Sequence, residues 1–153
     1  MFTYTDILKD AGAKTASGYG EVAAVAKTIN LGAGLVRGNV VFDVSAMALQ
    51  SNDELYQILL MGGNNASFTK EVALANIELG CREVIEETLD SKLGRYILPF
   101  ENEKNGVVYP YVRIRFVISG TTPSINFVAR LEKDLPIRGT VVTDRSFAST
   151  TTT

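Results

Sequence analysis

The glutamates between residues 82 and 87 are the residues of this sequence whose types and spacing could do chemistry. The run Arg82-Glu83-Val84-Ile85-Glu86-Glu87 would place several carboxylates along a short helix. Carboxylate oxygens are ligands for Mg²⁺, and a bound Mg²⁺ could polarise a diphosphate for hydrolysis. The run therefore raises the hypothesis of a metal-dependent hydrolase, which the surrounding sequence has to support.

The surrounding sequence does not complete such a site. The run is similar to one half of the signature of the Nudix pyrophosphohydrolases, which also requires a glutamate and two glycines at fixed positions. This chain has Leu74 in place of that glutamate, and Phe68 and Leu89 in place of the glycines. A metal site needs all its carboxylate ligands and the turn that aims them, so the sequence favours a solvated helix face over catalysis.

The absence of histidine narrows the chemistry further. A chain without His lacks the commonest general base, the Ser-His and Cys-His nucleophile pairs and every imidazole metal ligand. Cys81 is the only cysteine, which excludes an internal disulfide and a Cys-rich zinc site and suits a reducing cytosol. We therefore predict a protein that is not an enzyme and has no catalytic residue, no metal and no cofactor.

The composition is that of one soluble globular domain. The 153 residues are 46% apolar and 21% charged, with a net charge of −2, which is unlike a disordered or fibrous chain. The near-neutral balance argues against direct nucleic-acid binding. No apolar run reaches the roughly 20 residues of a membrane span, and residues 1–10 lack the apolar core of a signal peptide. We expect neither a nucleic-acid partner nor a membrane partner.

Alternation of apolar and polar residues recurs along the chain and predicts an all-β fold. Residues 40–46 place Val40, Phe42, Val44 and Ala46 on one side of a strand. Weaker strand candidates are residues 23–31, 54–61, 72–79, 95–101 and 137–143. Short strands joined by Gly- and Asn-rich turns predict an antiparallel jelly roll, another β-sandwich or a barrel.

The strongest alternation lies in residues 111–131. In residues 111–119 alternate positions would face inward, and Arg113 and Arg115 would face outward; the inward residues are Val112, Ile114, Phe116 and Ile118. A turn follows at Gly120-Thr121-Thr122-Pro123, and the alternation resumes over residues 125–131. This pattern predicts an antiparallel hairpin.

Residues 81–93 break the β pattern. Cys81, Val84, Ile85, Thr88 and Leu89 recur at helical spacing, with charged residues opposite. We predict one short helix inserted between strands.

Both ends of the chain are predicted to be extended arms, over residues 1–21 and 134–153, on either side of a sandwich domain over residues 22–133. Frayed ends are the common explanation of unpatterned termini. The alternative is that the arms lie across a neighbouring subunit, because they contain apolar residues that a frayed tail does not need. These residues include Phe2, Tyr4, Ile7 and Leu8 at one end, and Phe147 at the other.

Arginine and tyrosine gather on the polar face of the strand at residues 111–119. Arg113 and Arg115 lie near Tyr109 and Tyr111, and the predicted hairpin would place Arg130 opposite them. One interpretation is a solvated outer sheet face, the default for antiparallel sheets. The other is a protein-binding face, because Arg and Tyr are enriched in interfaces.

The second half of the chain resembles a known family. The segments that carry the resemblance are residues 94–100 (GRYILPF), 109–121 (YPYVRIRFVISGT) and 125–131 (INFVARL). Together they resemble the jelly-roll capsid cement, or decoration, proteins of tailed bacteriophages, and the similarity extends from Ile29 to Leu131. The charged segment at residues 81–93 and the length of the tail beyond Lys133 depart from the family pattern.

The resemblance implies a structural protein of the virion, located on the capsid surface and assembled in the host cytoplasm. It implies that the protein binds the major capsid protein, and that it associates with itself as a homodimer or else a trimer. No cofactor follows from it. The alternatives are another virion β-sandwich component, such as a tail or head fibre, and a carbohydrate-binding module, although a chain without Trp offers little aromatic surface to a sugar.

Overall fold

The computed structural model of the chain describes residues 6–133. This part is built almost entirely of β-strands, with one short helix, α1 (Arg82–Ile85), so the predicted all-β fold is confirmed. The long strands are β7 (Arg37–Met47), β8 (Leu55–Gly63), β9 (Glu71–Gly80), β10 (Gly94–Glu101), β13 (Tyr111–Ser119) and β14 (Ile125–Lys133). The short strands are β1 (Ile7–Lys9), β2 (Ala13–Lys14), β3 (Gly18–Tyr19), β4 (Glu21–Val22), β5 (Val25–Ala26), β6 (Ile29–Asn30), β11 (Glu103–Lys104) and β12 (Val107–Val108).

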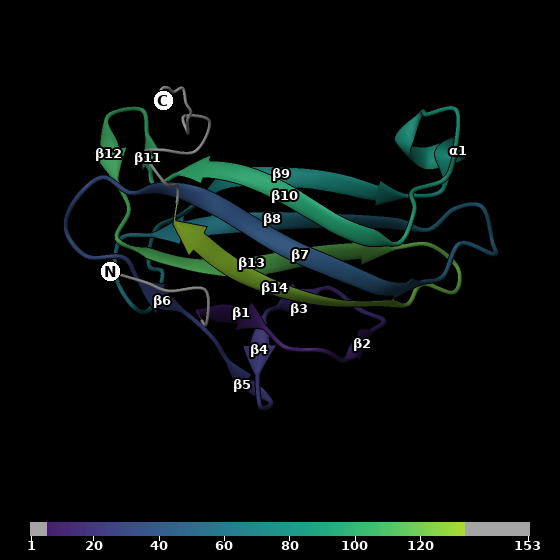
Figure 1. Cartoon of the computed structure of the whole chain (residues 1–153), viewed down its shortest axis with the longest axis horizontal. Helices are drawn as coiled ribbons and strands as arrows, with labels where there is room; N and C mark the ends of the chain where they lie inside the picture. Colours follow the sequence, from purple (N-terminus) through teal and green to yellow (C-terminus); the bar gives the residue numbers. More distant parts are fainter. Residues whose placement is uncertain (1–5, 134–153) are drawn as a thin grey trace, which may run out of the picture.

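The strands form two facing antiparallel sheets with the topology of a jelly roll (Figure 1). One sheet has the order β1-β14-β7-β10, and β2 continues β1 along β14. The other has the order β3-β13-β8-β9, and β6 continues β3 along β13. Each sheet thus has four strand positions, and the chain crosses to the opposite sheet after every position except at the β8–β9 hairpin. This winding is the double Greek key of a jelly roll.

Alternate side chains of both sheets meet in a single core. Phe127 of β14 packs edge-on against Phe42 of β7 and Phe116 of β13, with ring centroids 6.2 and 6.0 Å apart. The apolar residues predicted to face inward from the long strands are buried with them. Ala46 and Ile118 are the exceptions: Ile118 is half-buried, and β7 has one extra residue, Ser45, between its pairs with Asn126 and Phe127, which leaves Ala46 exposed.

The predicted hairpin between residues 111–119 and 125–131 is wrong. Both strands exist, but β13 pairs with β8 and β14 pairs with β7, so they belong to different sheets. The connection crosses the end of the sandwich beside Glu54. A Cβ at Gly120, whose φ is +121°, would lie 2.8 Å from the Glu54 Cα. Alternation looks the same whether the next strand pairs alongside or crosses to the facing sheet, which is why the pattern could not separate the two.

The other strand predictions have mixed outcomes. Residues 54–61, 72–79 and 95–101 correspond to β8, β9 and β10. Residues 23–31 do not form one strand: Ala23 and Ala24 adopt positive φ angles of 54° and 64° and turn the chain between β4 and β5. The chain then leaves β5, which pairs with β4, and continues as β6, which pairs with β13. The strand predicted at residues 137–143 lies outside the described residues.

The N-terminal residues differ from the predicted arm. Ile7–Lys9 and Ala13–Lys14 pair with β14, and Gly18–Tyr19 pairs with β13, so this part of the chain supplies strands to both sheets. Leu8 is fully buried in the core and is therefore not a subunit contact. The segment escaped prediction because its pairings are two or three residues long, too short for a periodic pattern.

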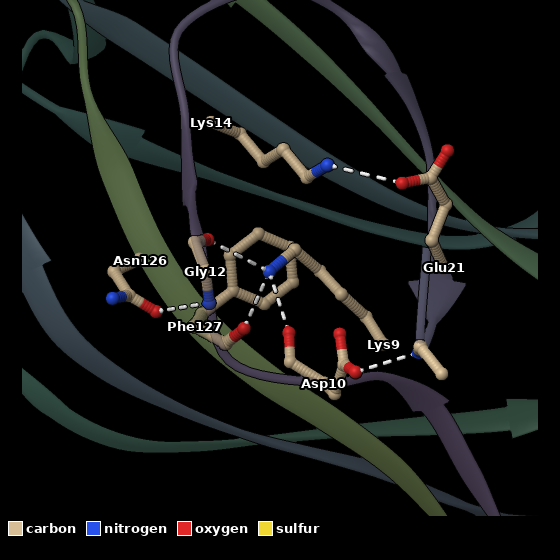
Figure 2. Close-up of polar contacts among 8 residues, drawn as sticks. Lys9, Asp10, Gly12, Lys14, Glu21, Asn126 and Phe127 are labelled. Carbon is tan, nitrogen blue, oxygen red and sulfur yellow. Dashed lines mark hydrogen bonds and ion pairs between the residues drawn. The ribbon is translucent and has the colours of Figure 1, made fainter. Parts of the chain in front are cut away.

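A buried lysine fastens this N-terminal segment to β14 (Figure 2). The Lys9 ammonium donates hydrogen bonds to the carbonyls of Phe127 (2.7 Å), Asp10 (3.0 Å) and Gly12 (3.2 Å) and lies 4.4 Å from the centroid of the Phe127 ring. Burial and the nearby Lys14 charge lower the pKa of Lys9 to about 8. Lys9 therefore keeps its proton at neutral pH and can donate all three bonds.

The predicted helix over residues 81–93 is limited to one turn. Its helical backbone stops at Ile85, because Glu86 adopts the left-handed conformation with φ 59° and ψ 51°. The carboxylates of Glu83, Glu86 and Glu87 therefore do not follow one continuous helix face.

Candidate protein-binding surface

The outer face of the β3-β13-β8-β9 sheet combines apolar side chains with two arginines, and the exposed Glu78 lies on its β9 edge, paired with Gln57 of β8. In neighbouring strands Arg113 pairs with Met61, and Arg115 pairs with Leu59 on one side and Tyr19 on the other. Met61 is buried, and Leu59 is half-buried. We call this surface the Arg115 face and define it by Tyr19, Leu59, Met61, Phe68, Arg113, Arg115 and Val117.

Arg113 is the centre of this face. Its guanidinium carbon lies 3.9 Å from the centroid of the Tyr19 ring and 4.1 Å from that of the Phe68 ring. The same guanidinium forms an ion pair with Glu71 at 3.0 Å, and both side chains are largely buried, 21% and 18% exposed. Arg113 thus ties β3, the β8–β9 connection and β9 to the middle of the sheet, and is occupied by contacts within its own chain.

Phe68 reaches this position through a tightly bonded turn. The Asn65 carbonyl accepts a bond from the Phe68 N–H, and the Asn65 side-chain oxygen accepts one from the Ser67 N–H, both at 3.0 Å. Phe68 itself has a φ of +52°. Its ring lies over Gly63, where a Cβ would come within 2.3 Å of the ring. The glycine at 63 therefore makes room for the aromatic ring that stacks on Arg113.

Arg115 differs from Arg113. Its side chain is exposed, and among the arginines of residues 6–133 it alone forms no ion pair with another residue of this range. An unpaired guanidinium beside half-buried apolar side chains can take a carboxylate and an apolar group together, the combination found at interface hot spots.

On the outer face of the β1-β14-β7-β10 sheet, charged side chains form ion pairs with one another. Asp43 pairs with Arg95 at 2.9 Å and with Arg130 at 3.3 Å, and Arg130 also pairs with Glu132 at 3.0 Å. The hydrogen bond from Arg95 is the main reason that the pKa of Asp43 lies below its ordinary value. We call this surface the Asp43 face, defined by these four residues.

The structure separates the predicted contact residues. Arg113, Arg115 and Tyr111 lie on β13, and Tyr109 precedes it, close to Gly62 at the strand's beginning. Arg130 does not lie opposite them, because β14 belongs to the other sheet and Arg130 is part of the Asp43 face. Ile7 is half-buried in β1 beside Arg130. Phe2, Tyr4 and Phe147 lie outside the described residues.

The sequence did not predict Tyr19 and Phe68 as members of this face, or Glu71 as the ion-pair partner of Arg113. Their contacts with Arg113 join segments that are far apart in the sequence. The available signal was weak: an aromatic residue after the Gly63-Asn64-Asn65 turn, and another between Gly18 and Gly20.

The buried carboxylate of Glu54 is a second polar cluster, and it is satisfied internally. Burial opposes its ionisation, but hydrogen bonds from Cys81, Ser51 and Thr122 outweigh this effect and lower the pKa of Glu54 to about 2. Burial raises the pKa of the Cys81 thiol, so this thiol is neither exposed nor activated. The cluster joins three turns at one end of the sandwich and is a structural clamp.

The described residues contain no group of three or more His, Cys, Asp or Glu side chains placed to hold a metal ion. No helix within residues 6–133 is long and apolar enough to cross a membrane. No protein-family model, curated protein or solved structure matches the chain.

Proposed function

We propose that this protein is a capsid cement protein of a tailed bacteriophage, which binds the outer surface of the assembled head and bridges neighbouring major-capsid subunits. The Arg115 face is the observation that carries the proposal. On this face the exposed guanidinium of Arg115, which has no ion pair among residues 6–133, lies beside apolar side chains of an ordered sheet. On the Asp43 face the charged side chains form ion pairs with one another. We assign the Arg115 face to contacts with other subunits of the particle.

The jelly roll suits this role because a cement protein works as a rigid link. Arg113 and Lys9 hold the short N-terminal strands against the two sheets, so the Arg115 face is ordered before any partner binds. A preformed surface spends less conformational entropy on binding. Binding only to the assembled shell would stabilise that state alone, and many identical contacts would sum by multivalency.

The proposal needs no cofactor and places the protein on the virion surface, with the major capsid protein and further copies of itself as partners. The sequence resemblance over residues 29–131 is the second line of support.

Co-sedimentation with expanded, DNA-free shells of the matching phage tests the proposal. We expect saturable binding at a fixed copy number per capsid subunit. Arg115→Glu should weaken this binding about tenfold or more, as charge reversal in an interface does, while Arg37→Glu, a change to another exposed arginine on the opposite sheet, should leave it unchanged. Absence of binding by the unmodified protein would contradict the proposal, and a shift of its melting temperature by a soluble glycan would favour the carbohydrate-binding alternative.

A further inference from the structure

A loop at one end of the sandwich carries exposed apolar side chains. Residues 82–93, here called the acidic loop, contain α1 and connect β9 to β10; α1 projects beyond the sheets in Figure 1. Leu89 and Leu93 are 59% and 57% exposed. Acidic residues outnumber basic ones in this loop: Glu83, Glu86, Glu87 and Asp90 against Arg82 and Lys92.

The acidic loop is held in shape at its base. The Ser91 side chain accepts a hydrogen bond from the Gly80 N–H, and the Ser91 N–H donates to the Gly80 carbonyl, both at 3.0 Å. Asp90 accepts a bond from the Arg82 N–H at 2.8 Å. The exposed leucines are therefore presented by an ordered loop, which lowers the entropy cost of docking them.

Two carboxylates of this loop remain unpaired. Glu83 pairs with Arg82 at 3.5 Å, and Asp90 is used within the loop. Glu86 and Glu87 are exposed and form no ion pair with any residue between 6 and 133. The loop thus offers free carboxylates beside exposed leucines, and the Arg115 face offers a free guanidinium beside half-buried apolar side chains.

We infer that the acidic loop of one copy docks on the Arg115 face of a second copy. Arg115 is opposite in charge to Glu86 and Glu87, none of the three has an ion pair among residues 6–133, and apolar side chains lie beside each of them. The bonds to Gly80 hold the loop at the end of β9, which is aligned through Leu55 with Ser119, four residues along β13 from Arg115. The loop therefore does not contact Arg115 of its own copy, and we assign it to the Arg115 face of another copy. The inference goes beyond the proposed function by naming the occupant of the Arg115 face.

This contact predicts how the copies associate. Reciprocal docking of two loops closes a dimer, and one-way docking builds a ring or an open chain. Both arrangements bury the same two surfaces and leave the Asp43 face free.

Sedimentation velocity of the full chain over a concentration series, without shells, tests the inference. The unmodified protein should form oligomers. Arg115→Glu and the pair Glu86→Lys with Glu87→Lys should each raise the apparent dissociation constant about tenfold or more. The protein that carries all three changes should recover association to within a few-fold of the unmodified chain, because the complementary charges are exchanged.

Arg37→Glu is the matched control and should associate normally, and the circular dichroism spectrum of each variant should show the unmodified β-sheet content. A monomer at every concentration, unchanged association after either charge reversal, or failure of the combined variant to recover would each overturn the inference. Because no shell is present, these outcomes are distinguishable from a failure of the cement proposal, which is decided by co-sedimentation.

Discussion

The outer faces of the two sheets arise from the same alternation of residues but treat charge in opposite ways. On the Asp43 face, Arg95 and Arg130 share one aspartate, and Arg130 also pairs with Glu132. On the Arg115 face, Arg113 is enclosed by two aromatic rings and a carboxylate, and Arg115 has no ion pair among the described residues. The described charges of the first face are paired within the chain, whereas the second face leaves the Arg115 guanidinium without an ion pair among residues 6–133.

The two sheets also show that the distance between two charged groups does not by itself determine how much their ion pair contributes to stability. Arg37 and Glu101 approach to 2.7 Å with the arginine 67% exposed, whereas Arg113 and Glu71 approach to 3.0 Å while largely buried. Water screens the first pair, and the enclosed pair cannot lose one member without leaving an uncompensated charge.

Arg113→Ala should have the largest effect on stability. It removes two ring contacts and leaves Glu71 without its partner, so we expect a loss of about 2–3 kcal/mol in the free energy of unfolding. Arg37→Ala, the exposed control, should lose about 0.5 kcal/mol or less. Urea unfolding of both variants measures the difference, and equal losses would show that the two faces do not differ in the way described.

Gly63→Ala should have the next largest effect. The added Cβ would approach the Phe68 ring within 2.3 Å, so the ring has to leave its place over Arg113. Overpacking of this kind costs about 1–3 kcal/mol. The same unfolding measurement checks the loss. In the Arg113→Ala background, Gly63→Ala should lower the free energy of unfolding by less, because the contact between the Phe68 ring and Arg113 is already absent. Full additivity of the two changes would contradict this coupling.

Glu54→Gln should alter the response to acid. The pKa of Glu54 is about 2 in the folded protein against an ordinary value of 4.5. The unfolded chain therefore binds a proton more readily, and this carboxylate's contribution to stability is present above about pH 4.5 and is lost as the pH falls toward 2. The variant should be less stable at neutral pH but lose less stability over this pH range. Unfolding curves at several pH values test this. If both proteins lost the same stability between about pH 4.5 and pH 2, the Glu54 carboxylate would not stabilise the fold in the way described.

Asp43→Asn should have the smallest effect. Asp43 is 41% exposed, and exposed ion pairs contribute about 0.5 kcal/mol. Because the folded-state pKa of Asp43 is lowered, this small difference from the unmodified protein should disappear in acid. Urea unfolding at neutral pH and in acid measures it, and shell binding should not change. Weakened shell binding would place a contact on the Asp43 face.

The sequence predicted the long strands because their alternation is set by burial on one side. Strands β7, β8, β13 and β14 repeat the pattern over many residues, and the jelly roll could be named from the resemblance. The crossing between β13 and β14 could not be predicted, since the pattern of side chains does not specify which neighbour a strand pairs with. The early end of α1 was missed because it depends on the left-handed backbone of Glu86.

The candidate site was predictable only in part. Alternation predicts that Arg113 and Arg115 face outward, but it does not predict that their contacts differ. Arg113 is contacted by Tyr19 and Phe68 from distant segments, whereas Arg115 has no ion pair among the described residues. The position of Phe68 depends on its positive φ and on the space over Gly63. Such features belong to the folded chain rather than to any local pattern.

Oxidative footprinting of the protein on the assembled particle, compared with the dilute free protein, tests the central claim most directly. We predict strong protection of Tyr19 and Leu59 on the Arg115 face, with no protection of Ile97, which is 59% exposed on β10 of the opposite sheet. Protection of Ile97 with unchanged oxidation of Tyr19 and Leu59 would contradict the assignment of the Arg115 face to contacts in the particle.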